Sequence, residues 1–180
     1  MKKQNLNSKK GFTIIEVVLV LAIAGLIFLM VFIAYPALRR SQSDTQRRND
    51  LSRFISQLAQ YKANNRKVPQ DNKDLINFRK NYLDGNYTKT TYADGDVTAA
   101  SNYGTADKFL DPDGEPYMIV YKGNPSGTIT LADSQTMNHQ IHYYTKARCQ
   151  GESVVVSQGK NDVAIQYNLE NGVYCGTNAE

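Results

Sequence analysis

Residues 9–38 read KKGFTIIEVVLVLAIAGLIFLMVFIAYPAL, and this stretch decides the fold of the first part of the chain. From Val17 to Leu38 there are 22 consecutive residues without a charge, and almost all of them are apolar. A helix of about 20 apolar residues is long enough to cross the hydrocarbon core of a bilayer. The stretch therefore predicts a membrane helix at the start of the chain.

Glu16 lies at the edge of this apolar segment. An ionised carboxylate at membrane depth costs several kcal/mol unless it is neutralised or paired. One interpretation is a glutamate in the first helical turn, which the helix dipole favours by less than about 1 kcal/mol. The other requires a cation at the same depth. Cleavage between Gly11 and Phe12 would supply one, because Phe12 would then carry a free α-amine that Glu16 of a neighbouring subunit could pair with.

Two simpler interpretations of the segment explain less. Ala22-Ile23-Ala24 is similar to a secretory cleavage site, but the apolar run continues through Ile33, where a polar cleavage region should begin. A plain single-pass anchor explains the length of the run but not Glu16.

The residues Lys-Lys-Gly-Phe-Thr-Ile-Ile-Glu, from Lys9 to Glu16, resemble the class III signal of type IV pilins and type II secretion pseudopilins. That signal has a short basic leader ending in glycine, an N-terminal phenylalanine, a glutamate four residues on, and an uninterrupted apolar helix. The resemblance implies a leader at residues 1–11, cleavage by prepilin peptidase between Gly11 and Phe12, and N-methylation of Phe12. It also implies that Glu16 acts in assembly by pairing with the Phe12 amine of a neighbour.

The helix is expected to continue beyond the apolar segment, which covers residues 12–38. Residues 39–65 contain good helix formers and no glycine or proline, and an apolar stripe recurs there at helical spacing, comprising Leu51, Phe54, Ile55, Leu58 and Tyr61. We expect one helix from Phe12 to about Asn65, kinked or locally opened at Pro36. In type IV pilins a glycine-to-proline stretch can melt in the filament. By resemblance, melting between Gly25 and Pro36 is a hypothesis here, although Ile33 occupies the usual proline position.

The rest of the sequence, after residue 65, predicts an α+β fold in which the long N-terminal helix packs on a C-terminal antiparallel β-sheet. Residues 66–108 are expected to form an αβ-loop that begins with a short helix from Asp71 to Phe78, with no further helix or strand after it. Residues 109–180 are expected to form the sheet. The stretch from Asp111 to Tyr117 resembles the turn that opens the sheet in major pseudopilins. The predicted strands cover residues 116–122, 128–132, 140–147, 153–157, 163–169 and 173–175.

Cys149 and Cys175 are the only cysteines. On the far side of a membrane segment, such a pair predicts a disulfide formed in an oxidising compartment. The bond would close a loop of about 27 residues, worth roughly 3–4 kcal/mol. Two unrelated buried thiols are the alternative.

The net charge of +4 comes from the first ten residues, since the chain after residue 11 has 17 basic and 17 acidic residues. Net charge therefore does not indicate nucleic-acid binding. A role in DNA uptake stays open for the arginines between Arg39 and Arg53, but the interleaved Asp44 and Asp50 favour ion pairs with acids on neighbouring helices.

No catalytic chemistry is indicated by the sequence. There is no nucleophile–base pair, phosphate loop or CxxC motif, so we expect no enzyme activity and no cofactor. Two residues three apart on a strand face opposite sides, so His139 and His142 cannot share a metal ion. Asp111, Asp113 and Glu115 do not have the spacing of an EF-hand and are typical of a turn, so no metal site is expected.

These observations predict a structural subunit, the major pilin, of a type IV pilus. The expected partners are other copies of the chain in a helical filament, prepilin peptidase, the pilus assembly platform and its motor ATPase. The precursor would cross the inner or cytoplasmic membrane once, and the mature subunit would join an extracellular pilus. A pseudopilin of a type II secretion or competence system is the first alternative, and a monomeric membrane-anchored binding module is the second.

Overall fold

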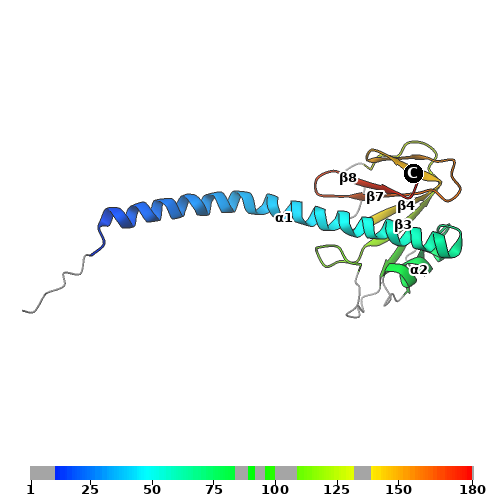
Figure 1. Cartoon of the computed structure of the whole chain (residues 1–180), viewed down its shortest axis with the longest axis horizontal. Helices are drawn as coiled ribbons and strands as arrows, with labels where there is room; N and C mark the ends of the chain where they lie inside the picture. Colours follow the sequence, from blue (N-terminus) through cyan, green and yellow to red (C-terminus); the bar gives the residue numbers. More distant parts are fainter. Residues whose placement is uncertain (1–10, 84–88, 92–95, 100–108, 132–138, 180) are drawn as a thin grey trace, which may run out of the picture. The chain divides into compact units, whose positions relative to one another are not determined.

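The computed structural model of the chain describes residues 11–83, 89–91, 96–99, 109–131 and 139–179 (Figure 1). The leader residues 1–10 lie outside this set, as do residues 84–88, 92–95 and 100–108 of the expected αβ-loop. The chain divides into two compact units, residues 1–41 and 42–180.

The helix α1 extends from Ile14 to Asn65 and contributes to both units. The helix continues through Pro36 without interruption, so the local opening that was expected at this proline is not seen. The helix ends where Arg66 adopts a left-handed conformation, with φ of 58°, and its backbone N–H donates to the carbonyl of Lys62 at 2.8 Å. This end agrees with the prediction from the sequence.

A second, short helix follows as expected, and a turn of π-helix extends it. The helix α2 covers Asn72–Phe78, and the side chain of Asp71 caps it by accepting a hydrogen bond from the backbone N–H of Asp74. The segment η1, Arg79–Leu83, continues it with π-helical hydrogen bonding. The sequence did not predict η1.

In the part of the chain that the structure describes, eight strands form two sheets. Six of them make one sheet in the order β1-β2-β3-β4-β7-β8, and β5 and β6 make the second. Their bounds are β1 Lys89–Thr91, β2 Asp96–Ala99, β3 Met118–Gly123, β4 Gln140–Thr145, β5 Ala147–Gln150, β6 Ser153–Val156, β7 Val163–Asn168 and β8 Val173–Thr177.

The sheet differs from the prediction in three places. The segment 128–132 was expected to be a strand, but its described residues make only an isolated bridge, between Ile129 and Val154. No hairpin follows β3 as a result, and β3 pairs parallel to β4, so the sheet is mixed. The expected strand at 140–147 is divided at Lys146, whose φ is 49°, and β5 then leaves the large sheet. Finally, β1 and β2 lie in a stretch that was expected to be an irregular loop.

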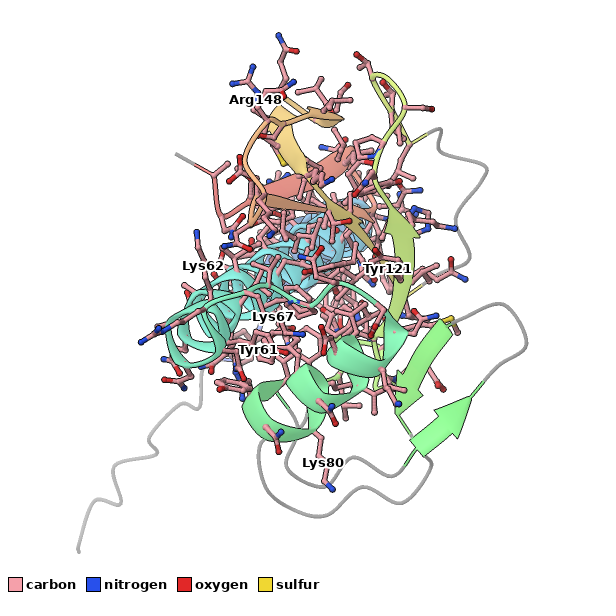
Figure 2. All side chains as sticks on the ribbon, turned by 90° about the vertical axis from the view of Figure 1, so that its right-hand side faces the viewer. Tyr61, Lys62, Lys67, Lys80, Tyr121 and Arg148 are labelled. Carbon is pink, nitrogen blue, oxygen red and sulfur yellow. A yellow bond between two sulfur atoms is a disulfide. The ribbon has the colours of Figure 1, made fainter. Side chains whose placement is uncertain are left out.

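The main core lies between α1 and one face of the six-stranded sheet. The predicted stripe is buried, with Leu51, Phe54 and Leu58 fully covered and Tyr61 5% exposed. Side chains of α2, β3, β4 and β7 complete the same cluster, and Figure 2 shows side chains filling the space between the ribbons. Because Ile141 and Tyr143 of β4 belong to this cluster and Tyr144 to another, β4 is buried on both faces.

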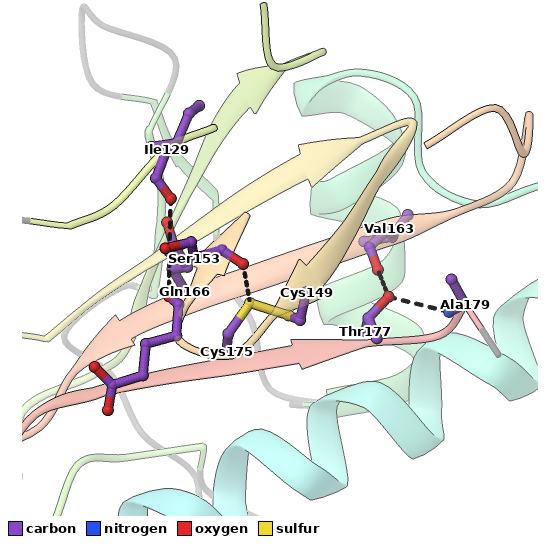
Figure 3. The surroundings of a disulfide bond; sticks show 9 residues. Ile129, Cys149, Ser153, Val163, Gln166, Cys175, Thr177 and Ala179 are labelled. Carbon is purple, nitrogen blue, oxygen red and sulfur yellow. Dashed lines mark hydrogen bonds between the residues drawn. A yellow bond between two sulfur atoms is a disulfide. The ribbon is translucent and has the colours of Figure 1, made fainter. Parts of the chain in front are cut away.

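The second cluster is covered by the two-stranded sheet. A disulfide joins Cys149 of β5 to Cys175 of β8, and it ties the small sheet to the edge of the large one (Figure 3). Gln166 of β7 supports the same layer, since its Nε2 donates to the carbonyl oxygens of Ile129 at 3.3 Å and Glu152 at 2.7 Å.

Candidate functional site

The first unit presents an apolar helical surface that its own chain does not cover. All large apolar side chains from Phe12 to Leu38 are between 49% and 90% exposed. Among the described residues, α1 is the one helix long and apolar enough to cross a membrane. Removing so many apolar side chains from water is worth on the order of tens of kcal/mol. This half of the helix therefore requires lipid or other helices around it.

Glu16 is engaged at the start of α1 by Thr13. Its Oε2 atom accepts hydrogen bonds from the backbone N–H and the side-chain hydroxyl of Thr13, both at 2.8 Å. In return the hydroxyl of Thr13 accepts from the backbone N–H of Glu16 at 3.4 Å. This reciprocal arrangement is a capping box, which satisfies two N–H groups at the helix terminus. It gives the carboxylate a partner within its own chain.

Gly11 and Phe12 lie directly before this cap, and the fold places no demand on either side chain. A Cβ atom built on Gly11 would meet nothing within 4 Å, and Phe12 is 90% exposed. A requirement for glycine or phenylalanine at these positions would therefore have to come from a partner molecule.

The expected site residues fall into two separate places. Gly11, Phe12 and Glu16 lie together at the beginning of α1, whereas Cys149 and Cys175 lie in β5 and β8. Sequence reasoning missed Thr13, although the spacing Thr-x-x-Glu before an apolar run is a recognised start signal of a helix.

In the second unit, Arg47 of α1 is buried and binds four carboxylates. Its Nε and Nη2 atoms donate to the two carboxylate oxygens of Asp111 at 2.8 and 3.1 Å. Nη2 also donates to Asp113 at 3.1 Å, while Nη1 donates to Glu170 at 3.2 Å and Asp44 at 3.3 Å. We call these five residues the Arg47 cluster.

The Arg47 cluster connects α1 to two turns of the sheet through hydrogen bonds. Asp111 opens the turn before β3, where its backbone N–H donates to the carbonyl of Glu115. Asp44 binds the turn between β7 and β8, because its carboxylate accepts from the backbone N–H groups of Glu170 at 3.0 Å and Asn171 at 3.1 Å. Asp44 and Arg47 continue the buried stripe of α1 toward its N-terminal side, with 8% and 5% exposure.

The electrostatics of the cluster favour its charged form. Burial by itself would raise the pKa of Asp111, but hydrogen bonds from Arg47 and Tyr167 outweigh it, and the pKa of Asp111 is lowered. The hydrogen bond to Asp111 is also the main reason that the pKa of Arg47 is raised. Asp50, nearby on α1, behaves differently. Burial raises its pKa although it accepts a hydrogen bond from the Tyr117 hydroxyl at 3.1 Å.

Metal-ligating atoms also come together in this cluster. Atoms of Asp111, Asp113 and His139 that could bind a metal ion lie within 4.8 Å of one another, and His139 Nδ1 is 3.5 Å from Asp111. Sequence reasoning did not connect His139 with the two acids, because it precedes β4 and is far from them in the chain. The Arg47 guanidinium already binds both carboxylates, so a cation would have to displace it.

The other arginines of the helix have different surroundings. The guanidinium of Arg48 lies 6.0 Å from the ring centre of Tyr174, and Arg53 Nη2 donates to the carbonyl of Leu83 at 3.5 Å. Arg47 forms the ion pairs that the interleaved acids indicated. Three of its four acid partners among the described residues come from turns of its own sheet. Pairing with acids on the helices of other subunits stays a prediction.

Comparison with known proteins bears on the first unit. A family model described as the prokaryotic N-terminal methylation motif matches residues 6–32, a range that includes the capping box and most of the exposed apolar surface. No curated protein and no solved structure matches the chain.

Proposed function

Because this chain belongs to the family of type IV pilins and pseudopilins, which carry this methylation motif, we propose that it is the major structural subunit of a type IV pilus filament. Members of the family are structural subunits and not enzymes. The motif implies an N-terminal hydrophobic helix that anchors the precursor in the membrane, and processing by prepilin peptidase.

The exposed apolar half of α1 is the observation that carries the proposal. From Val17 to Leu38 the helix is apolar on all sides, and its large apolar side chains are exposed. A helix of this kind is stable only in a continuous apolar environment. In the membrane, lipid supplies that environment. In a filament, the same segments of neighbouring subunits supply it for one another. The subunit would thus pass from one apolar environment to another during assembly.

Glu16 would determine how each subunit is aligned with its neighbours in the filament. We expect the carboxylate to pair with the methylated α-amine of Phe12 on a neighbouring subunit once the leader has been removed at Gly11. Neither charge is tolerated alone in an apolar helix bundle, so a subunit in the wrong register is rejected. Thr13 supports the carboxylate before that partner arrives, through the two hydrogen bonds of the capping box.

The proposal includes partners and a route. Prepilin peptidase would recognise the glycine and phenylalanine that the fold itself does not need. The assembly platform and motor ATPase would then extract the processed subunit from the inner or cytoplasmic membrane into a filament of identical subunits outside the cell.

One observation favours a second candidate, the pseudopilin of a secretion or competence system. The turn from Asp111 to Tyr117 resembles the turn that opens the sheet in major pseudopilins, and here Arg47 binds its first residue. The cysteine pair and the long stretch between α2 and β3 resemble pilins instead.

Mass spectrometry of the N-terminal peptide distinguishes these candidates. Material sheared from the cell surface should contain an abundant peptide that begins at methylated Phe12. Processed protein confined to the membrane fraction would favour the pseudopilin. An intact leader would contradict both, and would leave an anchored binding module.

A further inference from the structure

A pocket of about 700 Å³ lies in the second unit at the C-terminal end of α1. It is formed between the end of α1, the linker after it, α2 and η1, and Figure 2 shows Tyr61 and Lys67 between α1 and α2. Its volume is within the range of 300–1,000 Å³ that is usual for small-molecule sites. Neither the apolar surface of α1 nor the Arg47 cluster contributes to it.

Four asparagine side chains supply hydrogen-bond donors and acceptors to the pocket. Asn64 and Asn65 come from α1, Asn77 from α2 and Asn81 from η1. Each amide offers two donor hydrogens and an acceptor oxygen. The side chains of Asn77 and Asn81 are exposed and have no hydrogen-bond partner among the described residues. Their donors and acceptors are available to a ligand.

Two tyrosines contribute aromatic surface on one side of the pocket. Tyr82 packs against Tyr61 with ring centres 5.4 Å apart and stacks on Phe78 at 5.8 Å, so its ring is held in place. Its hydroxyl accepts a hydrogen bond from Asn64 Nδ2 at 3.0 Å. Tyr82 is only partly buried, which leaves part of this fixed ring facing the pocket.

The charges of the pocket cancel. Lys67 Nζ lies 2.8 Å from Asp74 Oδ2, and among the described residues these are the two charged side chains that line it. An anion would meet the carboxylate of Asp74 and a cation the ammonium of Lys67, so a net charge gains little. The lining residues that the structure describes include no aliphatic side chain, which disfavours a purely apolar ligand.

We propose that this pocket binds a neutral saccharide. Hydroxyl groups on a sugar ring are both donors and acceptors, which matches the amides of Asn77 and Asn81 and the paired ends of Lys67 and Asp74. The C–H face of a sugar ring packs well on a tyrosine ring such as that of Tyr82. The ligand class is therefore an uncharged hexose or N-acetylhexosamine unit, free or at the end of a surface glycan.

Ligand-detected saturation-transfer NMR on the processed full-length chain tests the proposal. The chain is kept in phosphocholine detergent, because detergents with sugar head groups would compete. The probes are the methyl glycosides of glucose, galactose, mannose and N-acetylglucosamine, with glucuronic acid as a charged sugar. At least one neutral glycoside should bind saturably, with a Kd of roughly 1 mM.

The variants identify the pocket as the place of binding. Asn77→Ala combined with Asn81→Ala should weaken binding at least about tenfold, and Asn77→Leu should also weaken it, because it replaces the amide by an apolar side chain of similar size. Gln60→Ala is the matched control, since Gln60 is an exposed amide on α1 that does not line the pocket. Its binding should match that of the unchanged protein. The proposal is overturned if no neutral glycoside saturates below about 50 mM, if only glucuronic acid binds, or if both pocket variants bind normally.

Discussion

Arg47 binds four carboxylates, two of which belong to well-buried side chains. The side chains of Asp111 and Asp44 are 0% and 11% exposed, so they depend on the guanidinium to be ionised at low cost. We expect Arg47→Met to lower the free energy of unfolding by about 3–5 kcal/mol, because removing one partner of a buried ion pair leaves the other uncompensated. Urea unfolding of the full-length chain, followed by circular dichroism, measures the change.

Asp113→Asn is the matched control for this prediction. The side chain of Asp113 also binds Arg47 but is 61% exposed, so water screens the interaction. We expect it to change the unfolding free energy by less than about 1 kcal/mol. If Arg47→Met and Asp113→Asn lowered the free energy of unfolding equally, burial would not determine how much the ion pairs of the Arg47 cluster contribute to stability.

His142 makes stability depend on pH. It is 6% exposed, and burial, with a smaller contribution from Lys122, lowers its pKa to about 4. In the unfolded chain the pKa is about 6.5. Between these values the unfolded state binds more protons, so the free energy of unfolding should fall by roughly 2–3 kcal/mol as the pH drops from about 6.5 to 4. Urea unfolding of the protein and of His142→Gln across this range tests the prediction. A difference between the two that is constant with pH would exclude His142 as the source.

At the scale of elements, the disulfide joins the two-stranded sheet to β8. The bonded cysteines are 26 residues apart, and closing a loop of this size restricts the unfolded chain by about 3–4 kcal/mol. Replacing Cys149 and Cys175 together by alanine should therefore destabilise the second unit by about that amount. Thermal unfolding with and without a reductant checks this. The reductant should bring the unchanged protein to the level of the variant and leave the variant as it was.

Elements with strong local signals were predictable from the sequence. The stripe from Leu51 to Tyr61 and the short helix that follows Asp71 depend on neighbours in sequence, and the structure has both. Methylation-motif residues are equally local, and the predicted Gly11, Phe12 and Glu16 lie within the range that the family model matches. The interaction of Thr13 with Glu16 was local as well and was overlooked.

Pairings between distant segments were not predictable in the same way. The adjacent predicted strands 116–122 and 128–132 favoured an antiparallel hairpin, but β3 pairs parallel to β4 instead. Strand pairing depends on packing against cross-strand and same-face neighbours, which the local sequence does not specify. Asp44 and Arg47 occupy core positions of the helical stripe, yet their charges are typical of a solvent-exposed face. Asp44 and Arg47 can be buried because Asp111 and Glu170, which lie on turns distant in sequence, contact them in the folded chain.

At the scale of the whole molecule, the proposed assembly depends on one carboxylate. Glu16→Ala should strongly reduce the yield of surface filaments, because the neighbouring Phe12 amine would then be buried without a partner. The Arg47 cluster and the core of the second unit do not include Glu16, so thermal unfolding of that unit should be unchanged. Shearing cells and quantifying the subunit in the sheared and membrane fractions measures the effect.

Val17→Ala serves as the comparison for Glu16→Ala. It removes apolar surface at the adjacent position but leaves the charge pair intact, so filaments should form in near-normal yield. Filaments in normal amounts from Glu16→Ala would contradict the role proposed for the carboxylate, while leaving the family assignment in place.

The disulfide has one more consequence if the subunit is assembled outside the cell, as proposed, where it would meet proteases. Cys149 and Cys175 enclose β6 and β7 within a covalent ring, and β7 is an inner strand of the large sheet. A single cut anywhere between the two cysteines would leave both fragments attached to each other. Because the disulfide joins the two fragments, a subunit cut once in this region could keep its fold. The C-terminal fragment would dissociate only after the disulfide was reduced.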